Sequence, residues 1–421
     1  MNKKKEFILK MGKETGSIIV ILTVGIFTGF LMLCLVHLLP VDRMYKNVLA
    51  SKDIINSHAQ IIPGYKSTEV DNYTDSIMLN EAICPVEAPL IERVVNNYQV
   101  NFYQDYTQQE NLLRYLEGGE GYRYQGYSHY WGGHQVLLKI LLLRFDYSDI
   151  LVGNVFLQML LIVLIVSGLC RTEKQYFIVP YTAAVLSMMP MTIALCIQYC
   201  AVFYITLIGS AVIVWKSKDI GTTKMYLLFL LLGMMTSYFD FLTYPLVSLG
   251  IPLITALIYA ENDKTLMRIF FIIKNSFAWW VGYLGMWGGK WVLGSVLCPE
   301  SGSLEVAIGS IRYRGSNMAE GMAISTFDVL LKNMFIFLRL PVILMLGIAC
   351  FFFILKSIRN RTLRREKIIQ CIPYILICFY PIIWYLIAKN HSYEHSFMAY
   401  RELAISVLAG LGMVARLSER A

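Results

Sequence analysis

The run SIIVILTVGIFTGFLMLCLVHLL at residues 17–39 decides the fold class of this chain. A helix needs about 20 mainly apolar residues to cross a hydrocarbon core of about 30 Å, and this run is long enough. A cleaved signal peptide would have an apolar region of about 7–15 residues and a small-residue cleavage site, whereas this run is longer and leads into Pro40. We therefore predict a retained membrane anchor, and the basic leader of residues 1–13 predicts a cytoplasmic N-terminus.

The composition of the 421-residue chain agrees with a membrane protein. Hydrophobic residues make up 57% and charged residues 16%, against about 25% charged in ordinary soluble domains. The same numbers exclude a disordered chain, a collagen, a coiled coil and a disulfide-stapled secreted domain. The net charge of +8 does not indicate nucleic-acid binding, because the Lys and Arg residues gather in loops that orient membrane spans.

Further apolar runs predict an all-α polytopic membrane protein with about ten transmembrane helices in a single domain, residues 1–421. After residues 17–39, the predicted spans are 149–170, 176–195, 199–215, 225–238, 242–260, 268–297, 327–355, 368–388 and 403–414. Alternate loops are basic, the richest being residues 356–367 with Arg361 and Arg364, whereas the turns at 196–198 and 240–243 hold no Lys or Arg. Because basic loops stay in the cytoplasm, we predict that both termini are cytoplasmic.

Three segments are then predicted to face outward: residues 41–133, 298–326 and 389–401. The amphipathic spacing of residues 41–55 and 135–145 predicts helices that lie in the membrane interface. The Tyr-rich stretch 98–130 fits either an aromatic belt at headgroup level or the lining of a glycan site. Cys84 and Cys298 are the two cysteines placed in outward segments, and sequence does not decide whether they form a disulfide.

The first outward segment holds a pair of carboxylates, Asp71 and Asp75, four residues apart. This spacing places both on one face of a helix. They could cap the start of that helix, or one could act as general base for a sugar hydroxyl if it lies within hydrogen-bond reach.

Charges inside predicted spans are a second signal, because a charge in the membrane is costly and is usually functional or paired. Asp240 is predicted at the outer end of a helical hairpin, and Arg339 near the middle of the eighth span. Either could bind substrate; Asp240 could instead cap a helix, and Arg339 could form an interhelical ion pair. Lys290 is expected to snorkel toward the interface.

The third outward segment gathers Lys389, His391, His395 and Arg401 within thirteen residues. The two histidines are four residues apart, but no clear third ligand follows at a zinc-site spacing, so we predict no metal. Lys, His and Arg side chains suit a phosphate site, with Arg401 supplying a rigid fork of donors. Arg401 could instead anchor the tenth span to lipid headgroups.

Five short motifs are spread along the chain from the first predicted span to the last. They are residues 39–48 (LPVDRMYKNV), 71–79 (DNYTDSIML), 127–134 (YSHYWGGH), 239–245 (FDFLTYP) and 390–395 (NHSYEH). In their order and predicted outward placement they resemble the GT-C superfamily of integral-membrane glycosyltransferases, and most of all a poorly characterised bacterial branch of it. The resemblance implies a GT-C-like fold in the bacterial plasma membrane, with an active site on the extracytoplasmic face.

The resemblance also implies roles for particular residues. A catalytic Asp in the first outward loop falls on Asp75, with Asp71 and Asp42 as the next candidates. The branch often has Arg-Tyr-Trp-His-Gly where this chain has His129-Tyr-Trp-Gly-Gly133, so its histidine role would pass to His129 or His134. The acidic pair separated by one residue, familiar in several GT-C enzymes, is absent here, which weakens the case for a metal. No cofactor is expected, and a divalent metal is possible but not supported.

The predicted function is transfer of a sugar from a polyprenyl-phosphate-linked donor to an extracytoplasmic glycan or lipid-linked acceptor, among membrane lipids and without nucleic acid. An activated phosphate leaving group requires that the protein position donor and acceptor and supply a base. The alternative is a non-catalytic polymerase-like, flippase-like or transporter protein of a surface-glycan pathway. A structural scaffold for an envelope complex is a third hypothesis, which would not explain the charges predicted inside the membrane.

Overall fold

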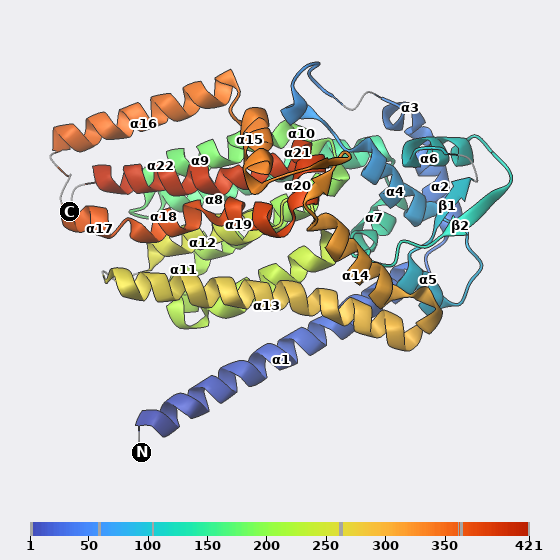
Figure 1. The fold of residues 1–421 in the computed structure, drawn as a ribbon, viewed down its shortest axis with the longest axis horizontal. Helices are drawn as coiled ribbons and strands as arrows, with labels where there is room; N and C mark the ends of the chain where they lie inside the picture. Colours follow the sequence, from blue (N-terminus) through green and yellow to red (C-terminus); the bar gives the residue numbers. More distant parts are fainter. Residues whose placement is uncertain are drawn as a thin grey trace.

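The structure, a computed structural model, describes residues 3–57, 60–102, 105–260, 264–360, 362 and 365–419. It is nearly all helical (Figure 1), which confirms the all-α part of the predicted fold class. Strand β1 (Gln99–Phe102) pairs antiparallel with β2 (Tyr122–Gln125), with Gln99 opposite Gln125. A second hairpin pairs β3 (Met318–Ala319) with β4 (Met322–Ala323).

Among the described residues, six helical segments are long and apolar enough to cross a membrane, so the ten predicted spans are not confirmed. They are Glu14–Val36 of α1 (Lys3–Val36), α8 (Tyr147–Cys170), Ile197–Lys216 of α11, α16 (Leu340–Asn360), Lys367–Ile387 and Ser396–Ser418. Two shorter apolar helices, Lys224–Phe239 and α12 (Val247–Tyr259), cover the predicted fifth and sixth spans. Helix α11 (Ile197–Phe239) joins the predicted fourth and fifth spans at Gly221, where φ is +61°.

The third predicted span is not one helix. Helix α9 (Ile178–Ser187) ends before Met189, whose φ is +57°, and α10 (Pro190–Ala194) begins at the next residue. A proline disfavours helical backbone at the residue before it, so Pro190 explains the break.

The eighth predicted span, 327–355, is also divided. Helix α15 (Thr326–Phe337) ends at Leu338, and α16 begins at Leu340 with Pro341 in its first turn. The pyrrolidine ring fits the start of a helix and disrupts its interior. Arg339 therefore lies at the junction of two helices, and its predicted position near the middle of a span is wrong.

Helix α13 (Thr265–Leu297) is one continuous helix over the predicted seventh span, although it is not among the six most apolar ones. It packs against α11 through Gly233 and Gly282. A Cβ on Gly233 would overlap the carbonyl oxygen of Trp279, and one on Gly282 would overlap that of Leu230. These two glycines let the helix backbones touch, as small residues do between membrane helices.

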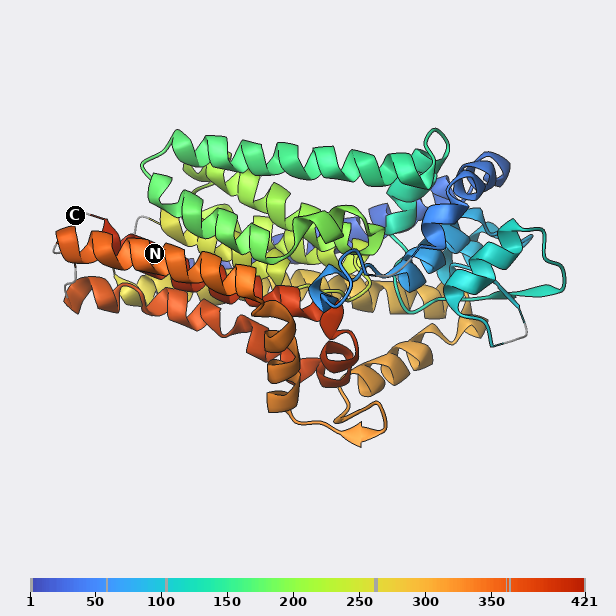
Figure 2. The same ribbon diagram turned by 90° about the horizontal axis from the view of Figure 1, so that it is seen from above.

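The three segments predicted to face outward lie toward the same end of the helix bundle, here called the loop end (Figures 1 and 2). Residues 41–133 form its far part, with α14 (Ser303–Arg314), α20 (Lys389–Glu394) and α21 (Ser396–Ala399) between that part and the long helices. The predicted interfacial stretch 41–55 forms α2 (Val41–Ala50) and α3 (Lys52–Ile55), and 135–145 forms most of α7 (His134–Leu142). The other elements of residues 41–133 are η1 (Lys66–Thr68), α4 (Asn72–Ile83), α5 (Leu90–Asn96) and α6 (Gln108–Leu116).

The start of α1 and the end of α22 (Ala404–Ser418) lie at the opposite end of the bundle (Figure 1). Arg361 and Arg364, predicted in the richest basic loop, lie outside the described residues. The remaining elements are η2 (Gln175–Phe177), η3 (Pro299–Ser301), α17 (Arg365–Ile369), α18 (Ile372–Cys378), α19 (Tyr380–Ile387) and η4 (Tyr400–Leu403).

Candidate functional site

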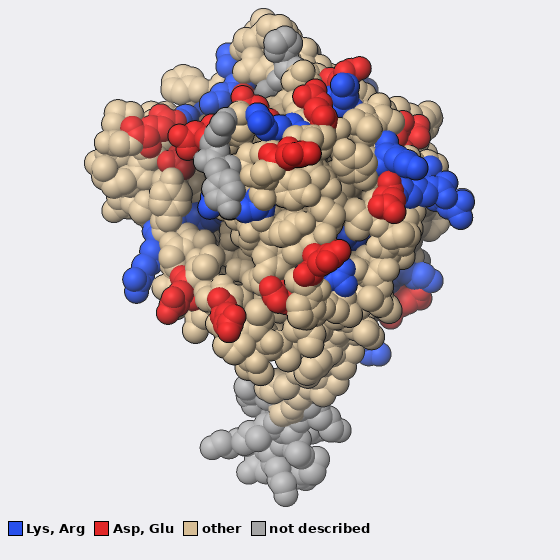
Figure 3. All heavy atoms as spheres, turned by 90° about the vertical axis from the view of Figure 1, so that its right-hand side faces the viewer, with Lys and Arg blue, Asp and Glu red and all other residues tan. Residues whose placement is uncertain are grey.

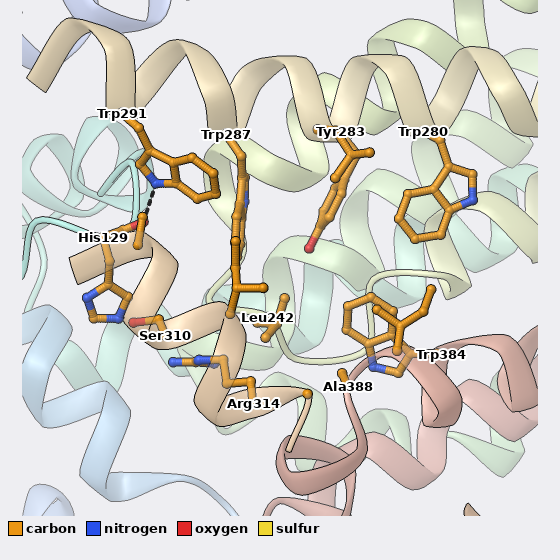
Figure 4. Close-up of a pocket in the computed structure, with 15 residues that line it drawn as sticks. His129, Leu242, Trp280, Tyr283, Trp287, Trp291, Ser310, Arg314, Trp384 and Ala388 are labelled. Atoms are coloured by element: carbon orange, nitrogen blue, oxygen red, sulfur yellow. Dashed lines mark hydrogen bonds between the residues drawn. The ribbon is translucent and has the colours of Figure 1, made fainter. Parts of the chain in front are cut away.

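A cavity of about 300 Å³ lies between the long helix α13 and the elements that follow it, α14 and the end of α19 (Figure 4). Side chains from α13, α14, the end of α19, the 240–246 turn and the 126–133 loop enclose it. The lining residues are His129, Leu242, Trp280, Tyr283, Leu284, Trp287, Trp291, Ala307, Ser310, Ile311, Arg314, Gly315, Trp384, Ile387 and Ala388. All three predicted outward segments or their borders thus contribute to one site.

One wall of the cavity is a ladder of four aromatic rings on α13: Trp280, Tyr283, Trp287 and Trp291 (Figure 4). Their spacing of three, four and four residues places them on one face of the helix. Neighbouring ring centres are 6.0, 5.8 and 5.4 Å apart along the series. Such a wall offers flat amphipathic surfaces to a ligand.

Among the described residues that line the cavity, Arg314 alone is charged. It stands in the last turn of α14, where a cation is favoured by the helix dipole. Its guanidinium carbon lies 5.3 Å from the centre of the Tyr130 ring, and one Nη donates to Nδ1 of His391 at 3.3 Å. Within the described residues, no carboxylate forms an ion pair with it.

The other polar groups of the cavity are uncharged. Burial, with the nearby Arg314 charge, lowers the pKa of His129 to about 3, so this imidazole is neutral. The carbonyl of His129 accepts a hydrogen bond from the indole of Trp291 at 3.4 Å. The indole N–H of Trp384 is buried and has no acceptor among the described residues. The cavity is therefore an apolar, aromatic space with one permanent cation.

Of the residues predicted in the third outward segment, the two histidines lie beside Arg314. His391 is buried, its ring centre is 4.6 Å from that of His395, and its Nε2 lies 2.6 Å from the carbonyl oxygen of Leu242. Burial lowers the pKa of His395 to about 4 and that of His391 well below its usual value. Lys389 is directed elsewhere, because its Nζ donates to Asn317 Oδ1 at 2.6 Å.

Arg401 is fully buried and does not line the cavity. Its Nε donates to the carbonyl of Met188 at 3.0 Å and its Nη1 to that of Phe397 at 3.2 Å. The guanidinium lies 4.3 Å from the ring centre of Tyr199, with two more tyrosine rings around it. In this arrangement Arg401 faces neither bulk headgroups nor the aromatic cavity.

Asp75 is enclosed at the start of α11. Its carboxylate accepts hydrogen bonds from the Tyr147 hydroxyl at 2.6 Å and from the backbone N–H groups of Ile197 and Gln198 at 2.8 and 2.9 Å. These two N–H groups belong to the first turn of α11, which a carboxylate stabilises as an N-terminal cap does. The structure thus gives Asp75 a structural environment, away from the cavity lining.

The two fallback carboxylates occupy helix starts as well. Asp71 is the N-cap of α4, accepting from the Thr74 N–H at 3.0 Å and the Thr74 hydroxyl at 2.8 Å. Asp42 is exposed in the first turn of α2. Neither lines the cavity.

Neither Asp240 nor Arg339 lines the cavity. Asp240 is buried and closes the turn between α11 and α12, accepting from the N–H and the hydroxyl of Thr243 at 3.0 and 2.6 Å. This turn presents Leu242 to the cavity. Arg339 lies with its guanidinium 5.7 Å from the ring centre of Tyr65, in the first outward segment.

His134 contacts a buried carboxylate instead of the cavity. Its Nε2 lies 3.0 Å from Oε2 of Glu81, and both side chains are buried. Lys290, expected to snorkel, is buried as well and donates to the carbonyls of Val94 and Val95 at 3.2 and 2.9 Å. The snorkelling prediction is therefore wrong.

Cys84 and Cys298 are both free thiols, so the structure contains no disulfide between them. Within the described residues, no group of three or more His, Cys, Asp or Glu side chains could hold a metal ion.

No family model matches this chain, and no curated protein or solved structure is significantly similar to it. The function must therefore be argued from the cavity itself.

Sequence reasoning did not single out Arg314 or the aromatic ladder as a site. A signal was present, since four aromatic residues repeat at helical spacing through residues 280–291. Arg314 stood within a predicted outward segment, but nothing in the sequence distinguished it from Arg312. Only the packing of α14 against α13 and α20 brings Arg314 to the cavity.

Proposed function

We propose that this chain is a multi-pass membrane glycosyltransferase of GT-C type, which moves a sugar from a polyprenyl-phosphate donor to an extracytoplasmic glycan or lipid-linked acceptor. One observation supports this most strongly: a permanent cation stands in an aromatic, otherwise uncharged cavity between α13, α14 and the end of α19. A lipid phosphate has matching chemistry, with one anionic group joined to a long apolar chain.

Arg314 is the residue we assign to the donor phosphate. Its guanidinium offers a rigid fork of donors and never loses its charge, and so it suits a phosphate whose charge grows as the sugar leaves. The rings of α13 would pack against the sugar or the first prenyl units. No metal enters this proposal.

We place the cavity on the extracytoplasmic face of a bacterial plasma membrane, with both termini in the cytoplasm. The basic loops support this orientation, because they join the helices at the end of the bundle opposite the cavity. Loops rich in Lys and Arg usually stay in the cytoplasm. Figure 3 shows charges of both signs interspersed over the loop end, in keeping with a surface that contacts headgroups and glycans rather than nucleic acid.

The alternative is a non-catalytic protein, flippase-like or transporter-like, that binds the same lipid phosphate without transferring the sugar. It is favoured by one observation: none of the described residues lining the cavity is acidic. The general base, which the family resemblance assigns to Asp75, would then have no role.

Both candidates are tested with full-length protein in proteoliposomes and a radiolabelled sugar on polyprenyl phosphate. We expect Arg314→Gln to slow transfer at least tenfold, a loss of about 1.4 kcal/mol of transition-state stabilisation. Arg312→Gln, an exposed arginine on the same helix, is the matched control and should transfer at the wild-type rate. Wild-type protein that moves the labelled lipid across the bilayer without releasing sugar to any acceptor would favour the flippase-like alternative.

A further inference from the structure

We infer that His391 is a positioning residue, which holds the Arg314 guanidinium in the cavity without neutralising its charge. This inference rests on the proposed role of Arg314 in binding a lipid phosphate. The sequence predicted that His391 contacts the phosphate. We infer instead that His391 orients Arg314, which contacts the phosphate.

The two hydrogen bonds of His391 fix its tautomer. The Leu242 carbonyl can only accept, so the proton must be on Nε2, 2.6 Å away. The Arg314 guanidinium can only donate, so Nδ1, 3.3 Å away, must carry the free lone pair. The two demands agree with one neutral imidazole, and the burial that lowers the pKa of His391 favours that same form.

A neutral acceptor has a specific advantage at this place. A carboxylate beside Arg314 would pair with the guanidinium and compete with an incoming phosphate. Here the nearest acidic side chain on α20, Glu394, instead accepts from the Tyr313 hydroxyl at 3.2 Å and from Asn390 at 3.0 Å. The contacts of Arg314 with His391 and the Tyr130 ring therefore orient the cation and leave its charge uncompensated.

The backbone that holds His391 is itself unusual. Leu242 has φ of +68°, in the left-handed region that non-glycine residues rarely adopt. Such strained residues persist where surrounding structure holds them, and they cluster at ligand sites. Leu242 lines the cavity, and its carbonyl oxygen accepts a hydrogen bond from His391 Nε2. Asp240 accepts from Thr243 and so closes the turn that contains Leu242.

The test is a double-mutant cycle on full-length protein in lipid nanodiscs, measured by equilibrium binding of radiolabelled geranyl phosphate and, separately, of uncharged geraniol. We expect His391→Ala to weaken geranyl phosphate binding about tenfold, the effect of losing one hydrogen bond to a charged group, and to leave geraniol binding unchanged. In an Arg314→Gln background, His391→Ala should cause no further loss, because it acts through a group already removed.

A second variant keeps the test decisive if His391→Ala folds poorly. His391→Asn retains a short side-chain acceptor near the position of Nδ1 and should bind geranyl phosphate within about threefold of wild type. Additive losses in the cycle, or an Asn variant as weak as Ala at equal thermal stability, would overturn the positioning role and leave the proposed function intact. Wild-type protein that binds geranyl phosphate no more tightly than geraniol would overturn both the phosphate role of Arg314 and this inference.

Discussion

At the scale of single residues, Asp75 shows how a charge with a functional sequence signature can be structural. Burial raises the pKa of its carboxyl to about 6 although hydrogen bonds from Tyr147, Gln198 and Ile197 oppose the rise. These donors complete the first turn of α11, and no described contact links the carboxylate to the cavity. The catalytic role of Asp75 stays a prediction. Measurements of stability and of transfer can distinguish that role from a structural role as a helix cap.

We expect Asp75→Asn to lower the free energy of unfolding by about 1–3 kcal/mol. The amide of asparagine has one acceptor oxygen and an NH₂ group, so one of the donors that now bond to the carboxylate would face another donor. Melting temperature in detergent measures this, and Asp53→Asn, an exposed residue of α3, should leave it unchanged. If Asp75 caps α11, transfer per folded molecule stays at the wild-type level. A variant of normal stability that transfers no sugar would show that Asp75 is the general base.

The stability difference between wild type and Asp75→Asn should also depend on pH. Between its ordinary pKa of 3.8 and about 6, Asp75 is protonated in the folded protein and ionised in the unfolded chain. The folded state then binds more protons, so wild-type stability should fall as pH rises through this window, by roughly 3 kcal/mol in all. The difference in melting temperature between wild type and Asp75→Asn should therefore change between pH 4 and 7, and a constant difference would contradict the raised pKa.

At the scale of elements, the contact between α11 and α13 holds the aromatic ladder in place. Gly233 and Gly282 let the two backbones touch, and the ladder begins in the same stretch of α13 at Trp280 and Tyr283. A side chain at the contact would separate the helices and shift the wall of the cavity.

We predict that Gly282→Ala destabilises the protein by about 1–3 kcal/mol through overpacking, measured as a lower melting temperature. Gly288→Ala on the same helix is the matched control, since a Cβ there meets no atom within 4 Å. That control should be neutral or stabilising by up to about 1 kcal/mol, because alanine favours a helix more than glycine does. Equal effects of the two substitutions would mean that α11 and α13 do not pack closely.

The elements also show what the sequence could and could not predict. Apolar runs correctly predicted a nearly all-helical chain. The length criterion did not take account of Pro190 and Pro341, which divide two of the predicted spans. Arg339 was placed in mid-membrane only because 327–355 was treated as one span. The cavity was not predictable, because it depends on α14 crossing between α13 and α20, a tertiary arrangement that helical periodicity does not contain.

At the scale of the whole molecule, several buried charged side chains contact helix ends. Carboxylates accept from first-turn N–H groups, as Asp75 does at α11 and Glu402 at α12. Cations donate to carbonyls at helix ends: Lys139 at α4, Lys290 at α5, Arg401 at α9 and Arg268 at α12. Backbone groups at helix ends lack partners within the helix, and the helix dipole favours each charge at the end where it stands.

This arrangement predicts the behaviour of Arg401→Lys. A lysine provides one compact charge where Arg401 reaches two carbonyls and three rings, so stability should fall by about 1–3 kcal/mol. Transfer per folded molecule should be unchanged. A stable variant whose transfer from lipid-linked sugar is at least tenfold slower would instead assign Arg401 to the donor phosphate.

The aromatic ladder also gives the cavity an optical reporter. The chain has seven tryptophans, and four of them, Trp280, Trp287, Trp291 and Trp384, line this one space. More than half of the indole rings of the protein therefore lie within contact distance of whatever occupies the cavity. A candidate lipid or sugar can thus be screened on the unmodified chain by the shift or quenching of its ultraviolet fluorescence, before its chemical identity is known.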